Sequence, residues 1–329
     1  MIRFLAARLG GMVLVLLVVT FVTYAVFYLL PSGPAQLSCG RPCTPENLAV
    51  AREFMGFGKP WWQQFGDFLT GILAGRTFGT GGSAIACPAP CFGYSFQQNA
   101  PVVDLIGDRF PVTASIAVGA AVAWLLLGVA TGVLSALKRG GPVDRIAMAG
   151  ALAGVSAPTY LVGLLGILLF GFTLDVVPTH GYVPLAESPV DWAWHLVLPW
   201  LVLAFAHAAI YARLTRGQMI ETLGEDFIRT ARAKGLTERR VVGRHALRNV
   251  LLPVVTLFGI DLGGLLGGAV ITERVFGMPG LGTLMIDAVH ELDLPLLLGC
   301  TLFAAFLIVL ANFAVDLLYG LLDPRARLT

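Results

Sequence analysis

Long apolar runs without charged residues recur along the 329-residue chain. A helix needs roughly 20 apolar residues to cross the hydrocarbon core of a bilayer, so runs of this length can be counted directly. Five runs contain no charged residue: 9–30, 112–137, 146–174, 192–212 and 294–315. A sixth run, 250–272, contains one charge, Asp261. We predict an all-α polytopic membrane protein with six transmembrane helices, in which Pro158, Pro199 and Pro253 are candidate bending points.

Composition and charge support this prediction and orient it. Hydrophobic residues make up 57% of the chain and charged residues 13%, which is far from the balance of a soluble domain. An even number of spans places both termini on one side. The face formed by the N-terminus, residues 138–145, residues 213–249 and the C-terminal tail holds 16 Lys/Arg and 6 Asp/Glu, whereas the opposite face holds 6 and 12. Because positively charged loops stay in the cytoplasm, we predict that both termini are cytoplasmic.

The predicted spans divide the chain into three parts. Residues 1–30 form a short tail and the first transmembrane helix, whose apolar run exceeds the roughly 7–15 residues of a signal peptide and which we expect to stay uncleaved. Residues 31–111 form an extracytoplasmic segment that is too long for a simple connector. Residues 112–329 form the transmembrane core, with a cytoplasmic loop at 213–249.

Four of the five cysteines lie in the extracytoplasmic segment, as Cys39-x3-Cys43 and Cys87-x3-Cys91. Outside the cytoplasm disulfides are the default state, and four cysteines allow three pairings. Paired cysteines at this spacing are also known as structural zinc ligands. We favour disulfides on the ground of location, and we predict no metal site.

Motifs that would indicate catalysis or nucleotide binding are missing from the sequence. His290-Glu291 begins like a zinc-protease motif, but Leu294 stands where the second histidine is required. A P-loop requires Gly-Lys followed by Ser or Thr, and none of the three lysines has that context. We therefore expect a non-catalytic chain without a bound cofactor. If ATP drives this protein, ATP and Mg²⁺ are bound by another chain.

The predicted loop from Arg213 to Arg248 is unusually long and basic. It carries nine Lys/Arg and four Asp/Glu over 36 residues, where a connection between helices usually needs about 2 to 8. One interpretation is a loop that only sets topology and is attracted to anionic lipid headgroups. The spacing of apolar residues argues against this interpretation. A short apolar face lies on each side of Gly235, which predicts two short amphipathic helices joined by a turn at this glycine. The faces are Leu223, Phe227 and Ala231, and then Val241, His245 and Leu247.

This loop resembles the ATPase-docking loop of ABC importer permeases, whose pattern is E-A-A-x3-G-x9-I-x-L-P. The chain has Arg229-Thr230-Ala231-x3-Gly235, then nine residues, then His245-x-Leu247-Arg248. The spacing fits throughout, and the altered letters are similar to those of the branch that transports dipeptides, oligopeptides and nickel. The resemblance implies a set of residues that couple the permease to the ATPase: Phe227, Arg229, Thr230, Ala231, Lys234, Gly235, Arg244, His245 and Leu247.

Motifs elsewhere resemble the same branch, so the similarity covers nearly the whole chain. They are Pro101-Val102-x-Asp104-Leu105-Ile106, Ser156-Ala157-Pro158-Thr159-Tyr160, Glu273-x2-Phe276-x2-Pro279-Gly280-x-Gly282 and the C-terminal segment from Val315 to Arg325. Each motif is weak alone, but their joint order on the expected spans is strong support. The four extracytoplasmic cysteines are not part of this pattern.

The resemblance implies a type I ABC importer permease fold in a bacterial inner membrane. It implies as partners a second homologous permease subunit, two ABC ATPase subunits and an extracytoplasmic substrate-binding protein, with transport by alternating access. A di- or oligopeptide is the first choice of substrate, and nickel or another small solute is the alternative. Two other classes are a secondary transporter, which would show inverted repeats and ion-coupling charges, and a membrane scaffold. No feature indicates nucleic-acid binding.

Asp261 is the residue that the bilayer makes most expensive, at roughly 2.5–3.5 kcal/mol for a charge near a helix centre. It should therefore face the interior of the helix bundle. The glycines that follow it, including Gly264 and Gly268, would allow close packing or a smooth pore wall. We consider two roles for Asp261: it lines the translocation path and attracts a peptide amino terminus, or it is a hydrogen-bonded structural carboxyl group.

Overall fold

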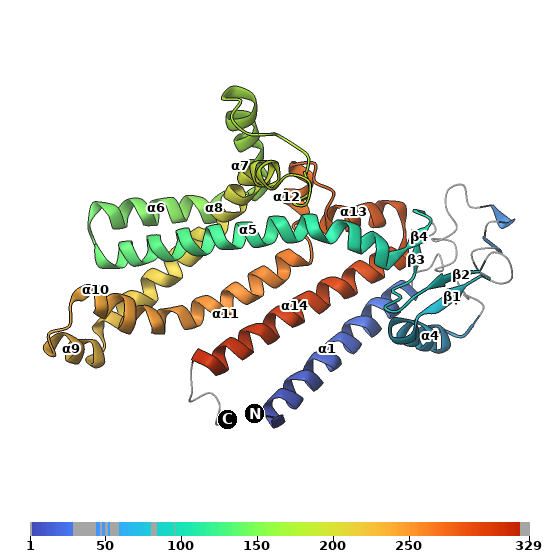
Figure 1. Ribbon diagram of the computed structural model, residues 1–329, viewed down its shortest axis with the longest axis horizontal. Coiled ribbons are helices and arrows are strands. Elements are labelled where there is room, and N and C mark those ends of the chain that lie inside the picture. The colour runs from blue at the N-terminus through green and yellow to red at the C-terminus, as the bar shows by residue number, and fades with distance from the viewer. Residues whose placement is uncertain are drawn as a thin grey trace. The chain divides into compact units, whose positions relative to one another are not determined.

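The computed structural model describes residues 2–28, 44–46, 48–49, 52, 59–79, 84–95 and 97–322 (Figure 1). The chain divides into two compact units. The first comprises residues 1–113, 266–270 and 279–309, and the second comprises residues 114–265, 271–278 and 310–329. The predicted Cys39 and Cys43 lie outside the described residues.

Five helical segments among the described residues are long and apolar enough to cross a membrane. Two are complete helices, α5 (Val102–Leu137) and α8 (Pro189–Gly224), and two lie within α1 (Ile2–Tyr28) and α14 (Leu294–Leu322). The fifth runs from Glu238 to Leu266 and includes α11 (Leu247–Leu266). With a bent helix pair counted as one span, the number rises to six. The prediction of a helical, multi-span membrane protein is confirmed.

The predicted span 146–174 is wrong as a single straight helix. It consists of α6 (Pro142–Ser156) and, after a bend of 104°, α7 (Thr159–Gly166) continued by the π-helix η2 (Ile167–Thr173). Ala157 between them has extended backbone angles, φ −83° and ψ 125°. Because proline disfavours the α-helical conformation of the residue before it, Pro158 ends α6 and starts α7. The bending point expected at Pro158 is therefore a complete break.

The first unit contains all the strands among the described residues. Strands β1 (Arg76–Phe78) and β2 (Ile85–Cys87) form one antiparallel pair, and β3 (Tyr94–Ser95) and β4 (Ala100–Pro101) form another. Phe78, Cys87, Cys91 and Tyr94 are buried together between them. Cys87 and Cys91 are joined by a disulfide, with their Cα atoms 5.6 Å apart.

Removing this disulfide is expected to loosen the strands locally. The bond closes a loop of only a few residues, for which the chain-entropy model gives roughly 2 kcal/mol of stabilisation. In the double variant Cys87→Ser, Cys91→Ser we expect faster proteolysis between residues 84 and 95, with the transmembrane helices unchanged. Limited proteolysis of the purified protein measures this. Equal cleavage rates in the variant and the wild type would contradict a stabilising role.

A second apolar cluster of the first unit lies around the start of α5, where Val102 and Ile106 pack against α13 (Leu281–Glu291) and the first turns of α14. The buried carboxyl group of Asp293, just before α14, accepts hydrogen bonds from the Ser95 hydroxyl and the Leu296 backbone N–H. Burial raises the pKa of Asp293 above its ordinary value. The short strands are thereby tied to the start of the last helix.

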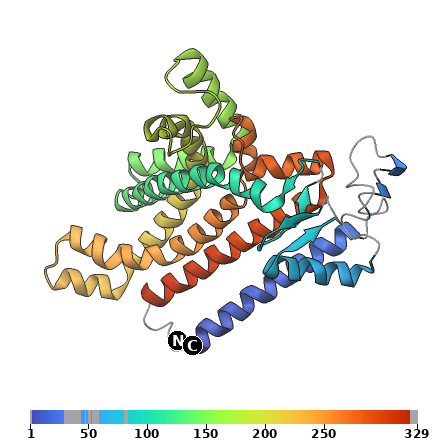
Figure 2. The same cartoon turned by 45° about the vertical axis from the view of Figure 1, so that its right-hand side comes forward.

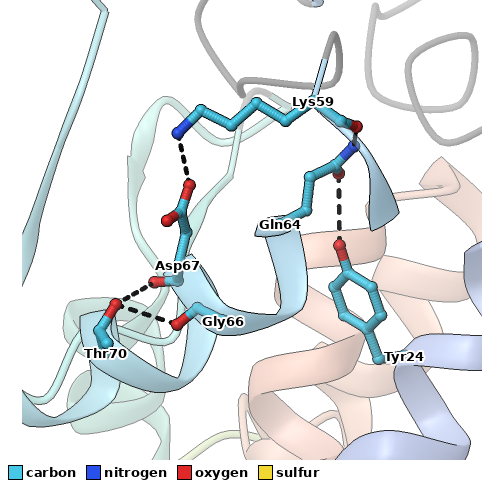
Figure 3. A network of polar contacts seen from close by, with 6 residues as sticks. All are labelled: Tyr24, Lys59, Gln64, Gly66, Asp67 and Thr70. Carbon is cyan, nitrogen blue, oxygen red and sulfur yellow. Dashed lines mark hydrogen bonds and ion pairs between the residues drawn. The ribbon is translucent and has the colours of Figure 1, made fainter. Parts of the chain in front are cut away.

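Helix α4 (Trp61–Ala74) packs on α1 through ring contacts of Phe65 with Phe21 and Tyr24, and through polar contacts that Figure 3 shows. The Tyr24 hydroxyl donates a hydrogen bond to Gln64 Oε1 at 3.3 Å, and Gln64 Nε2 donates one to the Lys59 carbonyl at 2.7 Å. Lys59 forms an ion pair with Asp67 at 2.5 Å. The apolar and charged sides of α4 fit a helix that lies at a membrane surface.

In the second unit, α5 and α8 approach closely because small residues line their contact. A Cβ atom built on Gly132 would lie 2.6 Å from Thr215 Cβ and 2.7 Å from the Ala212 carbonyl oxygen. One turn earlier, Gly128 meets Tyr211 and Ala208 in the same way. Helix α6 also packs on α8, and a Cβ atom built on Gly154 would lie 2.9 Å from Ala209 Cβ and 3.0 Å from the Phe205 carbonyl oxygen. Glycine at these positions permits backbone-to-backbone packing of membrane helices.

Candidate functional site

The predicted cytoplasmic loop is mostly helical. Helix α8 continues twelve residues past the expected span and ends at Gly224. Helix α9 (Asp226–Ala233) follows, and after a turn α10 (Glu238–Arg240) runs through the π-helix η3 (Val241–Ala246) into α11. Both views show the two arms folded back on each other as a hairpin at one end of the second unit (Figures 1 and 2). We call residues 226–246 the coupling hairpin, after the ATPase-coupling role that the sequence resemblance predicts for this loop.

Gly235 makes the turn of the hairpin. It has φ +76°, in the left-handed region that glycine occupies without steric cost. The Gly235 N–H bonds the Arg232 carbonyl at 2.9 Å, and the Leu236 N–H bonds the Ala231 carbonyl at 3.3 Å. These bonds close the end of α9. A Cβ atom on Gly235 would meet nothing within 4 Å, so only backbone strain opposes substitution there.

The inner face of the hairpin is a packed apolar core. Ile228 and Ala231 of α9 are buried with Val241 and Ala246 of the second arm. The same cluster contains residues of the supporting helices, namely Ala136 of α5, Met219 of α8 and Val250 of α11. The hairpin is therefore fixed to the ends of three helices, and a displacement of its core must act on them.

The structure corrects both predicted apolar faces of the loop. Phe227 was grouped with Leu223 and Ala231 on one apolar face, but Phe227 is 42% exposed, whereas Ala231 is buried and Ile228 takes the second buried position of α9. Glu225 has an extended backbone, with ψ 149°, so the helical phase restarts between Leu223 and Phe227.

In the second arm, His245 is only partly buried and Ala246 is buried instead. Val241 and Ala246 are five residues apart, the spacing of the i→i+5 hydrogen bonds of a π-helix rather than the i→i+4 bonds of an α-helix.

The outer face carries most of the residues expected to couple the chain to an ATPase. Ala231 is buried, His245 and Leu247 are partly buried, and the other six are exposed: Phe227, Arg229, Thr230, Lys234, Gly235 and Arg244. Among these six, Phe227 is the large apolar side chain. An exposed aromatic side chain can anchor a protein interface by filling an apolar pocket of the partner.

One ion pair fixes the two arms of the hairpin to each other. Arg232 at the end of α9 donates from Nε to Glu238 Oε1 at 2.7 Å and from a terminal nitrogen to Oε2 at 3.3 Å. Hydrogen bonding to Glu238 raises the pKa of Arg232 above its ordinary value. Arg229 pairs with Asp226 at 3.2 Å within α9, and both side chains are largely exposed, so this second pair contributes little.

Asp261 lies in α11, and its carboxylate accepts a hydrogen bond from the buried Tyr211 hydroxyl of α8 at 2.9 Å. The rings of Tyr211 and His207 lie beside Trp124 of α5. Asp261 itself is half-buried. The Asp261 carboxylate is therefore held by a hydrogen bond to Tyr211 and is still partly exposed at the surface of this chain.

The two glycines predicted with Asp261 differ in position. Gly264 is exposed on α11, one turn after Asp261, and a Cβ atom there would meet nothing within 4 Å. Gly268 lies beyond the end of α11, in the turn before α12 (Val270–Val275), with φ +142° and Gly282 within 3.0 Å of an added Cβ atom. Gly264 is therefore available to line a surface, whereas Gly268 is required by the turn.

No group of three or more metal-ligating side chains gathers among the residues that the structure describes.

Comparison with known proteins identifies the family. Residues 128–328 match the model of the binding-protein-dependent transport system inner membrane component, and residues 1–117 match the model of its N-terminal part. The chain is 36% identical to the dipeptide transport system permease protein DppB of Escherichia coli strain K12, over 99% of both chains. It is 37% identical to the di/tripeptide transport system permease protein DppB of Pseudomonas aeruginosa, again over 99% of both.

A solved structure shares the fold. The inward-facing MetNI methionine ABC transporter matches with a TM-score of 0.52 and 18% identity, over 67% of this chain and 97% of that chain. At this identity the match supports the fold alone. It agrees with the predicted type I importer permease architecture. The chain therefore belongs to the binding-protein-dependent transport system inner membrane components, the non-catalytic, multi-pass permease subunits of bacterial ABC importers.

Proposed function

We propose that this chain forms, together with a second homologous permease, the path by which di- and oligopeptides enter the cell. A substrate-binding protein delivers the peptide, and two ATPase subunits, which hold ATP and Mg²⁺, drive transport. One of these ATPases docks on the coupling hairpin of this chain. The peptide assignment rests on the relatives, which are named as dipeptide, di/tripeptide and peptide permeases. The docking assignment rests on the coupling hairpin, whose inner face is filled and whose outer face presents Phe227.

Reconstitution tests the substrate class. The chain is purified with its partner permease, ATPases and binding protein and reconstituted in proteoliposomes. ATP is supplied on the side of the membrane where the ATPase subunits lie. We expect ATP-dependent, vanadate-sensitive uptake of radiolabelled alanyl-alanine and no uptake of ⁶³Ni²⁺. Uptake of nickel without the dipeptide would overturn the peptide assignment but leave the importer class intact.

We further propose that Asp261 attracts the peptide's amino terminus through the carboxylate oxygen that does not bond Tyr211. The half-buried position and the adjoining exposed Gly264 support this role. Two isosteric variants separate it from a purely structural role. Asp261→Asn removes the charge, while Tyr211→Phe removes the hydrogen bond and leaves the charge in place.

The expected result is that Asp261→Asn raises the KM for alanyl-alanine by about tenfold, the size of one lost charge-assisted contact. Tyr211→Phe should change it by less than about threefold, because only a neutral donor is lost. Initial uptake rates in proteoliposomes measure both. An unchanged KM in Asp261→Asn would exclude the path role, and equal defects in both variants would make Asp261 a structural group.

A further inference from the structure

A partly buried ion pair joins α6 to α8 at the cytoplasmic end of the second unit. The Asp144 carboxylate, in the first turn of α6, receives two hydrogen bonds from Arg216 of α8: Nε to Oδ1 at 2.6 Å and a terminal nitrogen to Oδ2 at 2.8 Å. The Ser135 hydroxyl of α5 donates to Oδ1, and the Gly140 N–H of the α5–α6 turn donates to Oδ2 at 2.8 Å. One carboxylate therefore links α5, the turn, α6 and α8.

This pair differs from ordinary surface ion pairs in burial and geometry. Asp144 is 5% exposed and Ser135 is fully buried, and two-pronged binding by a guanidinium is directional as well as strong. The Arg216 side chain remains 27% exposed, so desolvation falls mainly on the carboxylate and offsets part of the attraction. An apolar contact would stabilise the helices equally well, so the pair's distinctive property is that it fixes their relative register.

The Asp144–Arg216 pair lies on the same helices that support the coupling hairpin. Arg216 lies eight residues before the end of α8 at Gly224, about 12 Å along a rigid helix, and α9 begins two residues later. On the other side, Ser135 precedes Ala136, which packs in the apolar core of the hairpin with Ile228 and Ala231. The hairpin and the Asp144 site thus share both α5 and α8.

We propose that Asp144 and Arg216 are a positioning pair for energy coupling, which makes the α5–α6 turn move together with α8 when an ATPase displaces the coupling hairpin. This proposal rests on the proposed docking at the hairpin. Without the pair, α9 and α8 can shift while α6 stays behind. ATP is then hydrolysed without a matching change in the transmembrane helices.

The test measures ATP hydrolysed per alanyl-alanine transported, using the complete transporter in proteoliposomes at equal amounts of assembled complex. For Asp144→Asn and Arg216→Gln we expect this ratio to rise about fivefold, within the range of coupling energies carried by such contacts. Arg216→Lys keeps the charge but loses the two-pronged geometry, so its ratio should lie in between. The matched control is Arg145→Gln, an exposed residue in the same turn of α6, whose ratio should stay at the wild-type value.

A purely structural pair would give a different outcome. Transport and ATP hydrolysis would then fall together with the amount of assembled complex, and an unchanged ratio would overturn the proposal. If the Asp144→Asn and Arg216→Gln variants fail to assemble, the same ratio is measured for Ser135→Ala and Arg216→Lys. Each of these two variants keeps a positively charged partner for Asp144. A wild-type ratio in both of these variants would also overturn it.

The Phe227→Asp variant distinguishes failure of this proposal from failure of docking. If Phe227→Asp loses ATPase co-purification and uptake while Arg216→Gln keeps the wild-type ratio, docking at the hairpin stands and the positioning role is wrong. If Phe227→Asp retains normal ATPase co-purification and uptake, docking at the hairpin is wrong as well.

Discussion

Replacing Phe227 with aspartate is expected to lower dipeptide uptake about 30-fold or more while leaving the permease folded in the membrane. The side chain is 42% exposed on α9, and the core behind it is formed by Ile228 and Ala231. Loss of an aromatic anchor from an interface typically costs about 2 kcal/mol or more, which corresponds to a roughly 30-fold weaker association. Co-purification of the ATPase with the variant permease and uptake in proteoliposomes measure the effect.

Two controls make this result specific to docking. Phe227→Leu keeps an apolar side chain and should retain most of the uptake. Ala233→Ser changes an exposed residue of the same helix that lies outside the predicted coupling set, and it should retain wild-type uptake. Normal ATPase binding by Phe227→Asp would contradict the anchor role. A bulky residue at Ala231 is a poorer test, because Ala231 is buried and its replacement would disturb the hairpin itself.

Replacing Gly132 with alanine is expected to destabilise the permease by about 1–3 kcal/mol, the usual cost of overpacking a filled core. The added methyl group would lie 2.7 Å from the Ala212 carbonyl oxygen. A backbone atom cannot rotate away, so α5 and α8 must separate. The thermal unfolding midpoint of the purified permease in detergent, read by circular dichroism, measures the loss.

The same helix provides a matched control for this substitution. Gly107 also lies in α5, and a Cβ atom there would meet nothing within 4 Å. Because alanine is the better helix former by about 1 kcal/mol, Gly107→Ala should leave the midpoint unchanged or raise it. Equal midpoints for Gly132→Ala and the wild type would show that the helices are not packed as closely as described.

The apolar runs correctly predicted where membrane helices occur, but not the residues at which these helices begin and end. Apolar runs locate helices because the bilayer requires them, but they do not locate the ends of helices that extend into water. Helix α5 begins at Val102, ten residues before the predicted run, since Asp104, Asp108 and Arg109 interrupt the apolar pattern without interrupting the helix. Helix α8 likewise extends to Gly224 through a basic stretch.

The coupling hairpin shows what helical periodicity can and cannot predict. Two helices joined at Gly235 were expected, and the structure has them. The grouping of apolar residues into two faces was wrong because Glu225 restarts the helical phase and because η3 is a π-helix, whose hydrogen bonds join residues five apart. A period of 3.6 residues predicts neither feature. The hydrogen bond from Tyr211 to Asp261 joins residues 50 positions apart and depends on tertiary packing alone.

The ion pair between Asp144 and Arg216 was missed for a related reason. Arg216 was counted only as one of the basic residues of the loop, and Asp144 as an acidic residue of the cytoplasmic face. Neither residue carries a local signal, and they are separated by 72 positions in the sequence. Burial of both the carboxylate and Ser135 became visible only when α5, α6 and α8 were assembled.

Photo-crosslinking from position 227 tests the central claim, docking of the ATPase on the coupling hairpin, most directly. Replacing Phe227 with p-benzoylphenylalanine keeps an aromatic side chain at the exposed position, and irradiation of the assembled transporter then labels whatever lies against it. The same amino acid at Arg139, in the exposed α5–α6 turn, is the comparison. We predict an adduct with the ATPase subunit from position 227 that is much stronger than from position 139. An ATPase adduct from position 139 and none from position 227 would contradict docking at the hairpin.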